Sequence, residues 1–153
     1  MGVLDNNQSK KNRSMGERPF TKTEQKLLKK SVGQLKQHVQ TKVNEYVRLR
    51  DSHLPCISCG VRSVTDAGHY IAIGRCDKLR FDLDNVHGQC EKCNRFGGGE
   101  IIDYRANLIK KIGVDRVENL EMRYQYYKRD TSKWDKVELV LLLRRIKELK
   151  SQL

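Results

Sequence analysis

Apolar side chains recur at every third or fourth position over residues 28–46, which is the spacing of one face of an α-helix. Thr21 and Glu24 stand three residues apart before this run and form a capping-box pattern, in which each side chain satisfies the other residue's backbone N–H. Pro55 steers the residue before it away from helical geometry. The sequence therefore predicts an N-terminal amphipathic helix over residues 21–52, whose apolar stripe consists of Leu28, Val32, Leu35, Val39, Val43 and Tyr46.

Helical spacing returns after residue 100, where it predicts a first helix over residues 100–112. Gly113 suits the end of that helix, because glycine accepts the left-handed geometry common at helix C-termini. Residues 114–153 are expected to form a C-terminal helical region, with one helix over residues 114–127 and another that begins at Ser132. Ser132 and Asp135 form the capping pattern of this last helix, whose apolar positions are Trp134, Val137, Leu141 and Leu149.

The chain is strongly basic, with 31 Lys and Arg against 19 Asp and Glu and a formal net charge of +12. Such a surface favours phosphate backbones or anionic membranes. The longest aliphatic run, residues 139–143, is too short to span a bilayer, so no membrane is expected and nucleic acid is the leading partner. No stretch of residues 1–30 resembles a signal peptide, which favours a cytoplasmic location.

Most of the positive excess lies in residues 1–50, which contain 12 Lys and Arg against 4 Asp and Glu. Residues 1–20 lack a hydrophobic period and are expected to form a disordered basic arm, either a DNA-contacting extension or a solubilising tail. The predicted N-terminal helix carries a row of lysines opposite its apolar stripe. A row of this kind is often only a solvated face, but the local charge favours contacts with DNA phosphates, with Lys29 and Lys36 among them.

Two Cys-x-x-Cys pairs, Cys56 with Cys59 and Cys90 with Cys93, frame the middle of the chain. Thiolates on a tight turn can take adjacent corners of a tetrahedron, so the two turns predict a structural Zn²⁺ site with these four ligands. Two disulfides are the alternative, which the spacing and the lack of a visible signal peptide disfavour. Cys76 has no partner two residues away and is expected to be a free or half-buried thiol.

The residues between and after the two pairs carry a family resemblance. The strings are Asp66-Ala67-Gly68-His69-Tyr70, Leu79-Arg80-Phe81-Asp82, Asn85-Val86-His87-Gly88-Gln89-Cys90, Cys93-Asn94 and Tyr104-Arg105. Together they resemble the NinG/Rap family of phage recombination endonucleases over residues 44–120. The resemblance implies a zinc-braced HNH-like, or ββα-metal, nuclease that acts on branched double-stranded DNA such as Holliday junctions or D-loops, with Mg²⁺ or Mn²⁺ as the catalytic cation.

We therefore expect an α+β fold, in which a small ββα-metal core with a four-Cys zinc site occupies residues 53–113 between long N- and C-terminal α-helices. Within the core, a short hairpin over residues 66–80 and a zinc-linked helix after Asn94 are expected. A four-way junction offers two equivalent strands, so a homodimer is the simplest arrangement. The apolar stripes of the N-terminal and C-terminal helices are long enough to form its interface, or to pack on their own core.

Phosphodiester hydrolysis needs an activated water and a cation that neutralises charge growing on the phosphate. His69 is the candidate general base, because an imidazole can accept a proton near neutral pH. Asn85 is the candidate holder of that ring, since its side-chain carbonyl can accept a hydrogen bond from the ring N–H. Asn94 and Asp66 are the candidate oxygen ligands of the catalytic cation.

One position departs from the wider HNH pattern, because Gly68, and not an acid or a histidine, stands directly before His69. Asp66 lies three residues before His69, and on a flat strand these two side chains point to opposite faces. A bulge at Ala67 and Gly68 would reunite them. His87 is the reserve ligand.

Arg75 and Arg80 are candidate phosphate clamps, although an arginine here could instead pair with Asp82 or Asp84. Two other functions are compatible with these residues. One is a zinc-dependent DNA-binding module without catalysis, which Gly68 favours, and the other is an HNH nuclease that cuts linear duplex DNA.

Overall fold

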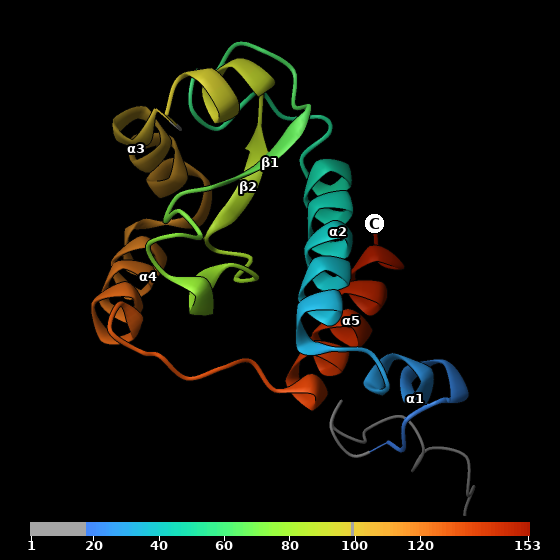
Figure 1. The fold of residues 1–153 in the computed structure, drawn as a ribbon. Helices are drawn as coiled ribbons and strands as arrows, with labels where there is room; N and C mark the ends of the chain where they lie inside the picture. Colours follow the sequence, from blue (N-terminus) through green and yellow to red (C-terminus); the bar gives the residue numbers. More distant parts are fainter. Residues whose placement is uncertain (1–17, 99) are drawn as a thin grey trace, which may run out of the picture.

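The computed structural model describes residues 18–98 and 100–153 (Figure 1). The basic arm expected over residues 1–20 therefore lies outside the described residues, apart from its last three positions. Among these residues, two α-helices precede a small two-stranded sheet and three follow it, which confirms the α+β part of the expected fold class. Its elements in order are α1 (Lys22–Leu28), α2 (Val32–Arg50), β1 (Asp66–His69), the 3₁₀ helix η1 (Asp77–Leu79), β2 (Val86–Gln89), the π-helical turn η2 (Lys92–Phe96), α3 (Ile101–Ile112), α4 (Val114–Tyr127) and α5 (Lys136–Lys150).

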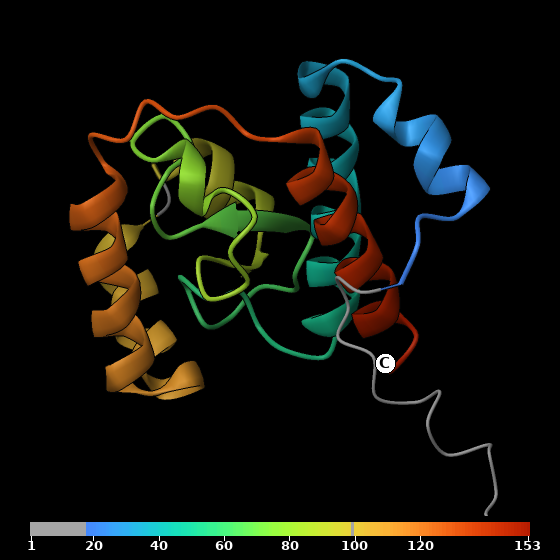
Figure 2. The ribbon, with the colours of Figure 1, turned by 90° about the horizontal axis from the view of Figure 1, so that it is seen from below.

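The two-stranded sheet lies between two helical pairs, with α2 and α5 on one side and α3 and α4 on the other (Figure 1). A linker of residues 128–135 runs from one pair to the other, and Figure 2 shows the same separation from below. No helix among residues 18–98 and 100–153 is long and apolar enough to cross a membrane.

Each helical pair encloses an apolar core of its own, and the sheet contributes to the boundary between them. The first core joins α2 and α5 with Ala67 and Val86 from the strands. The second core joins α3 and α4 with the turn before Cys59 and the connection between the strands, through Ile57, Ile71, Cys76, Leu79, Tyr104, Leu108, Val117 and Leu120. Cys76 is thus a buried thiol without a disulfide, and the expectation of a free thiol at this position is confirmed.

The apolar stripes of the terminal helices pack on each other within this first core. Leu35, Val39 and Val43 of α2 are fully buried, as are Leu139 and Val140 of α5. The predicted stripe of α2 is therefore covered by the chain itself. In the predicted stripe of α5, Val137 is 42% exposed and lies outside this core.

The single helix expected over residues 21–52 is divided in two at Ser31. The Thr21 capping box is present as expected, with the Glu24 N–H donating to Thr21 Oγ1 over 3.2 Å. A second capping box follows ten residues later, because Gln34 N–H donates to Ser31 Oγ over 3.2 Å and Ser31 N–H donates to Gln34 Oε1 over 3.0 Å. These local hydrogen bonds satisfy backbone groups at a new helix start and so break the first helix.

Short helix α1 has no buried residue of its own and is tied to α5 by an ion pair. The Arg144 guanidinium, which is 3% exposed, donates through Nε and Nη2 to the two carboxylate oxygens of Glu24, each over 3.0 Å. Arg18 also donates to Glu24, over 3.2 Å. The Glu24 carboxylate therefore fixes the position of α1 together with the partly buried Leu27 and Leu28, which pack against the first core.

Helices α3 and α4 match the expected ranges, and Gly113 separates them with a φ of 88°. The last helix begins later than expected, because Asp135, and not Ser132, is its N-cap. The Asp135 carboxylate accepts from Val137 N–H over 2.7 Å, and its capping-box partner is Glu138. Ser132 lies in the linker, where its N–H donates to Asp130.

The prediction of a hairpin within residues 66–80 is wrong, because the second strand lies further along the chain. Strand β1 pairs with β2 in an antiparallel register that runs from Asp66 opposite Gln89 to His69 opposite Val86. Residues 70–85 form the connection, and η1 lies within it. The pairing is one to one along all four positions, so the expected bulge at Ala67 and Gly68 is absent.

Candidate functional site

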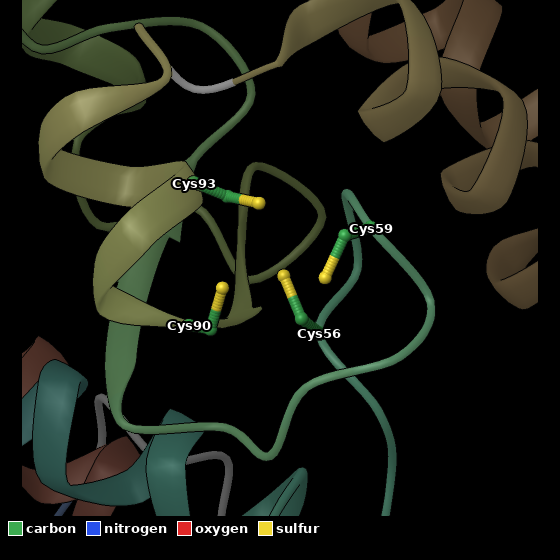
Figure 3. A group of neighbouring side chains, drawn as sticks. All are labelled: Cys56, Cys59, Cys90 and Cys93. Atoms are coloured by element: carbon green, nitrogen blue, oxygen red, sulfur yellow. The ribbon is translucent and has the colours of Figure 1, made fainter.

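The four predicted zinc ligands come together at one point of the fold. Figure 3 shows Cys56 and Cys59 pointing from one loop towards Cys90 and Cys93, and all four Sγ atoms lie within 4.8 Å of one another. Four sulfurs about 2.3 Å from a tetrahedral Zn²⁺ would be about 3.8 Å apart, so the cluster fits zinc with little contraction. Among the described residues, no other group of three or more His, Cys, Asp or Glu side chains gathers in this way.

The geometry of the first knuckle is set by its own backbone. Gly60 N–H donates to Cys56 O over 2.9 Å, and Cys56 N–H donates to Arg62 O over 2.8 Å. Gly60 has a φ of 66°, in the left-handed region that favours glycine. Burial opposes ionisation of the Cys59 thiol, but backbone N–H groups of Arg62 and Val61 outweigh it and lower the pKa of Cys59 to about 6. None of the five cysteines forms a disulfide, which excludes the disulfide alternative in this structure.

Two contacts join this knuckle to the rest of the core. Ile57 N–H donates to Gly88 O of β2 over 3.0 Å. Asn107 of α3 donates through Nδ2 to Ile57 O over 2.9 Å and to Ser58 O over 3.1 Å. The first knuckle is therefore held between a strand and a helix, so a metal bound by its cysteines would brace both.

Asp66 and Asn94 are two predicted site residues that the structure brings into contact. Asn94 follows Cys93 in η2, and its Nδ2 donates to Asp66 Oδ2 at the start of β1 over 2.9 Å. Arg95 Nε donates to the same oxygen over 3.2 Å. A half-turn of the Asn94 amide would present its oxygen beside the carboxylate, giving two oxygen donors of the kind that Mg²⁺ binds.

His69, at the end of β1, has a fixed tautomer. Its Nε2 lies 2.8 Å from Arg80 O, and because a carbonyl only accepts, the proton is on Nε2. Nδ1 then carries the lone pair and has no hydrogen-bond partner among residues 18–98 and 100–153. Burial lowers the pKa of His69 below its ordinary value, so the ring is neutral at pH 7.

The expected hydrogen bond between Asn85 and His69 is absent. Asn85 is fully buried and uses its side chain on the connection between the strands. Its Oδ1 accepts from Ile71 N–H over 2.7 Å, while Nδ2 donates to Ile71 O over 3.0 Å and to Leu79 O over 2.9 Å. These three bonds satisfy backbone groups of a loop without regular pairing, so Asn85 acts on the loop rather than on the ring.

Both ring nitrogens of His87, the reserve ligand, have hydrogen-bond partners within the protein. Arg50 Nη2 lies 3.1 Å from its Nδ1, and Asp84 O lies 3.1 Å from its Nε2. Burial first, and the charges of Lys111 and Arg50 next, lower the pKa of His87 to about 3. A neutral ring with both nitrogens engaged packs the core and does not offer a free lone pair to a metal.

Sequence reasoning did not single out Asp51, which is the most heavily bonded carboxylate of the core. It is 2% exposed and receives two hydrogen bonds of 2.8 Å from Arg50, one of 2.7 Å from Gly88 N–H and a 2.8 Å ion pair from Lys111. Burial opposes its charge, but these donors hold the pKa of Asp51 well below its usual range. The signals available in the sequence were an Arg-Asp pair at the end of a predicted helix and the family resemblance, which spans this position.

Two of the four predicted phosphate contacts are used inside the protein. Arg80 Nη1 donates to Asp77 Oδ1 over 2.9 Å, and Lys36 Nζ donates to Asp77 Oδ2 over 2.7 Å. Arg80 Nε also donates to Gln40 over 3.1 Å. Arg80 is therefore structural through Asp77, and not through the two carboxylates considered in the sequence.

Those two carboxylates pair with α4 instead. Asp82 accepts from Arg123, and Asp84 accepts from Arg116. The remaining predicted phosphate contacts, Lys29 and Arg75, are exposed and make no ion pair with any residue that the structure describes.

Comparison with known proteins places this geometry in context. A protein-family model described as "Bacteriophage Lambda NinG protein" matches residues 2–151. Protein ninG of Escherichia phage 933W is 41% identical over 91 residues, which are 58% of this chain and 45% of that protein. The matches to Protein ninG of Salmonella phage P22, at 41%, and of Escherichia phage lambda, at 40%, have the same extent. The matched part thus spans about half the length of these relatives, and no solved structure matches.

Proposed function

This chain belongs to the NinG family of phage proteins, and we propose that it is a metal-dependent endonuclease with an HNH-like, ββα-metal core. Its substrate is branched DNA, such as Holliday junctions or D-loops formed during phage recombination. The observation that carries the proposal is the contact between Asp66 and Asn94 directly beside the zinc ligand Cys93. A structural metal then fixes two oxygen donors at the start of the strand that ends in His69.

Asp66 and Asn94 are the residues that would hold Mg²⁺ or Mn²⁺, since a carboxylate and an amide oxygen are hard ligands. When bound, the cation supplies positive charge to the phosphate and the leaving oxygen. Arg95 occupies the same Asp66 oxygen, over 3.2 Å, and has to release it for a cation to bind. Its side chain is exposed and also pairs with Glu91 over 3.2 Å, so it would leave both carboxylates to reach a DNA phosphate.

His69 serves as the general base through Nδ1. The Arg80 carbonyl keeps the proton on Nε2, so the free lone pair is aimed away from that bond and is ready to take a proton from water. Burial lowers the pKa of His69 below its ordinary value, which favours the neutral, basic form of the ring near neutral pH. Asn85 maintains this arrangement by fixing the loop that carries Arg80.

DNA binding rests on the net charge of +12 and on cations without ion pairs among the described residues. Examples are Lys29, the C-cap of α1, and Arg75 on the connection. In this proposal the protein acts in the cytoplasm of the bacterial host as a homodimer, because two equivalent strands of a junction need two active sites. Sedimentation that gave only monomer, both free and on junction DNA, would reject the dimer.

One observation favours a second function, a zinc-dependent DNA-binding module without catalysis. The strand pairs one to one without a bulge, so nothing in β1 turns Asp66 and His69 towards the same face. In this alternative the contacts of Asp66 with Asn94 and Arg95 are only structural. A nuclease on linear duplex DNA is a third possibility, which differs from the first only in its substrate.

The experiment that separates these functions is a paired binding and nicking assay on a four-way junction and on linear duplex of the same length. His69→Ala should retain zinc and junction affinity, while Mg²⁺-dependent cleavage falls by about 10²–10⁴. His53→Ala, which removes an exposed histidine, is the matched control and should cut normally. A His69→Ala protein that cuts at the normal rate removes His69 from the mechanism.

Two further outcomes decide between the alternatives. Wild-type protein that binds the junction but never cuts it with Mg²⁺ or Mn²⁺ supports the non-catalytic module. Equal cleavage of the junction and the linear duplex supports the third function and contradicts the preference for branched DNA.

A further inference from the structure

A pocket of about 640 Å³ lies away from the candidate nuclease site, at the junction of the two helical pairs. It is lined by the ends of α2 and α3, by one face each of α4 and α5, and by the connection before β2, which lies between α4 and α5 (Figure 2). None of Asp66, His69 and Asn94 lines it. We call this space the inter-lobe pocket.

Positive charge predominates around the inter-lobe pocket. Its lining carries two carboxylates, Asp82 and Asp84, and His87 is neutral because its pKa is lowered to about 3. Asp51 does not line the pocket, but it adds a third negative charge because it pairs with two of the lining cations, Arg50 and Lys111. The cations outnumber these carboxylates by two, and they are Arg50, Lys111, Arg116, Arg123 and Arg145.

The lining cations differ in what they already bind. Four of them pair with carboxylates of the protein, either Asp51 or the two acids of the lining. Arg145 on α5 is exposed, lines the pocket and makes no ion pair with any residue that the structure describes. It is therefore available to an anion from outside.

A second observation, independent of the charge count, also indicates a ligand. Arg123 pairs through Nη1 with Asp82, but its Nε is buried and has no hydrogen-bond partner among the described residues. A buried guanidinium N–H without an acceptor costs free energy, and so it favours the arrival of an acceptor oxygen. An anion in the inter-lobe pocket would supply one once the Arg123 side chain turns its Nε towards the pocket.

We propose that the inter-lobe pocket binds a phosphodiester group of the DNA backbone, with Arg145 and the Nε of Arg123 as donors. A phosphate offers several oxygens to planar guanidinium groups and carries the charge that the lining lacks. The phosphate is taken to be that of DNA, which rests on the proposed function. This contact anchors the substrate at a point separate from the bond that is cut.

The test compares two single substitutions on the same helix. Arg145→Ala removes the unpaired cation of the inter-lobe pocket. Lys147→Ala removes an exposed cation two residues later, which lines a different pocket with Arg18 and Glu24. The two variants lose the same charge, so only position distinguishes them.

Binding of full-length, zinc-loaded protein to a labelled junction is measured against NaCl concentration, without divalent cation so that no cutting occurs. Since log K changes by about 0.9 per log unit of salt for each phosphate contact, Arg145→Ala should lower the slope by about 0.9 and weaken binding about eightfold at 0.1 M salt. Arg145→Lys should retain most of the slope, and Lys147→Ala should behave as wild type. As a second arm, inorganic phosphate should raise the melting temperature of wild type more than chloride of equal ionic strength, and should not do so for Arg145→Ala.

An unchanged slope for Arg145→Ala, or equal losses for the two alanine variants, overturns the proposal. Phosphate that stabilises the protein while the DNA slope is unchanged restricts the pocket to free phosphate, and so also overturns its role in DNA binding. The nuclease proposal is judged separately by Mg²⁺-dependent cutting. If the wild type cuts DNA but Arg145→Ala binds with an unchanged salt slope, only the pocket proposal is rejected. If Arg145→Ala lowers the slope but the wild type never cuts, only the nuclease proposal is rejected.

Discussion

Replacement of Asp51 by asparagine should be among the most destabilising single-atom changes in this fold. The carboxylate lies at the C-terminal end of α2 and is 2% exposed. It joins α2 to β2 through the 2.7 Å bond from Gly88 N–H, and to α3 through the 2.8 Å contact with Lys111. Asp51→Asn keeps the shape but removes the charge on which Arg50 and Lys111 both depend.

The magnitude follows from what remains buried after the change. Removing one partner of a buried ion pair costs about 3–5 kcal/mol, because the other charge is left without compensation. At Asp51 two cations lose the charge of their partner, while the asparagine oxygen can still accept two of the four hydrogen bonds, so we expect a loss within that range of about 3–5 kcal/mol. For a chain of this size, about 2–4 °C per kcal/mol corresponds to a fall in melting temperature of about 6–20 °C.

The assay is urea denaturation at a fixed excess of zinc, because zinc binding contributes to the free energy of folding. Glu91→Gln is the matched control, since it removes a carboxylate from an exposed ion pair with Arg95 and should cost less than about 1 kcal/mol. If Asp51→Asn loses no more stability than Glu91→Gln, the argument that this ion cluster joins the two halves of the fold is refuted.

The same cluster gives a pH dependence with a definite sign. The pKa of Asp51 is held below its ordinary value of 3.8 by its donors, despite opposition from burial. Its stabilisation is therefore fully present above pH 3.8 and is lost as the pH falls through the lowered pKa. The difference in unfolding free energy between wild type and Asp51→Asn should be constant from pH 7 to 5 and should shrink in stronger acid.

Two further predictions concern the metal and the first helix. Cys93→Ser, or treatment with a zinc chelator, should remove metal and fold together, and purified wild-type protein with no zinc but normal thermal stability would contradict this. Glu24→Gln should detach α1 from Arg144 and increase hydrogen exchange in residues 22–28 while the rest of the first apolar core stays protected. The Arg144 hydrogen bond lowers the pKa of Glu24 to about 2, so this attachment should be complete above pH 4.5 and weaken as the pH falls towards 2. Equal hydrogen exchange of residues 22–28 in Glu24→Gln and wild type would exclude the attachment.

The features that sequence predicted well are those set by short-range chemistry. The two Cys-x-x-Cys turns, the Thr21 capping box and the Gly113 boundary each depend on residues within a few positions of one another. The α+β class was expected from the family resemblance, and not from these local signals. The break at Ser31 was equally local, but the apolar stripe continues across it, and periodicity alone therefore predicted one helix.

The strand pairing depended on contacts that no local pattern reveals. Two strands of four residues are joined by a connection that includes a 3₁₀ helix, and the buried Asn85 side chain satisfies three of its backbone groups. A hairpin prediction that looked for a partner immediately after His69 therefore chose the nearest polar segment. The true partner begins after Asn85, at the point where the loop closes.

The relation between Asn85 and His69 shows why an order of residues can be informative while the contacts inferred from it are wrong. Asn85 does not touch the ring, but it binds Leu79 O, next to the Arg80 carbonyl that holds His69 Nε2. Asp77 holds Arg80 from the other side, over 2.9 Å. The tautomer of His69 is therefore set by a backbone atom, and a backbone atom has no signature in a sequence. Side chains that act through the loop can be recognised only once the loop is seen.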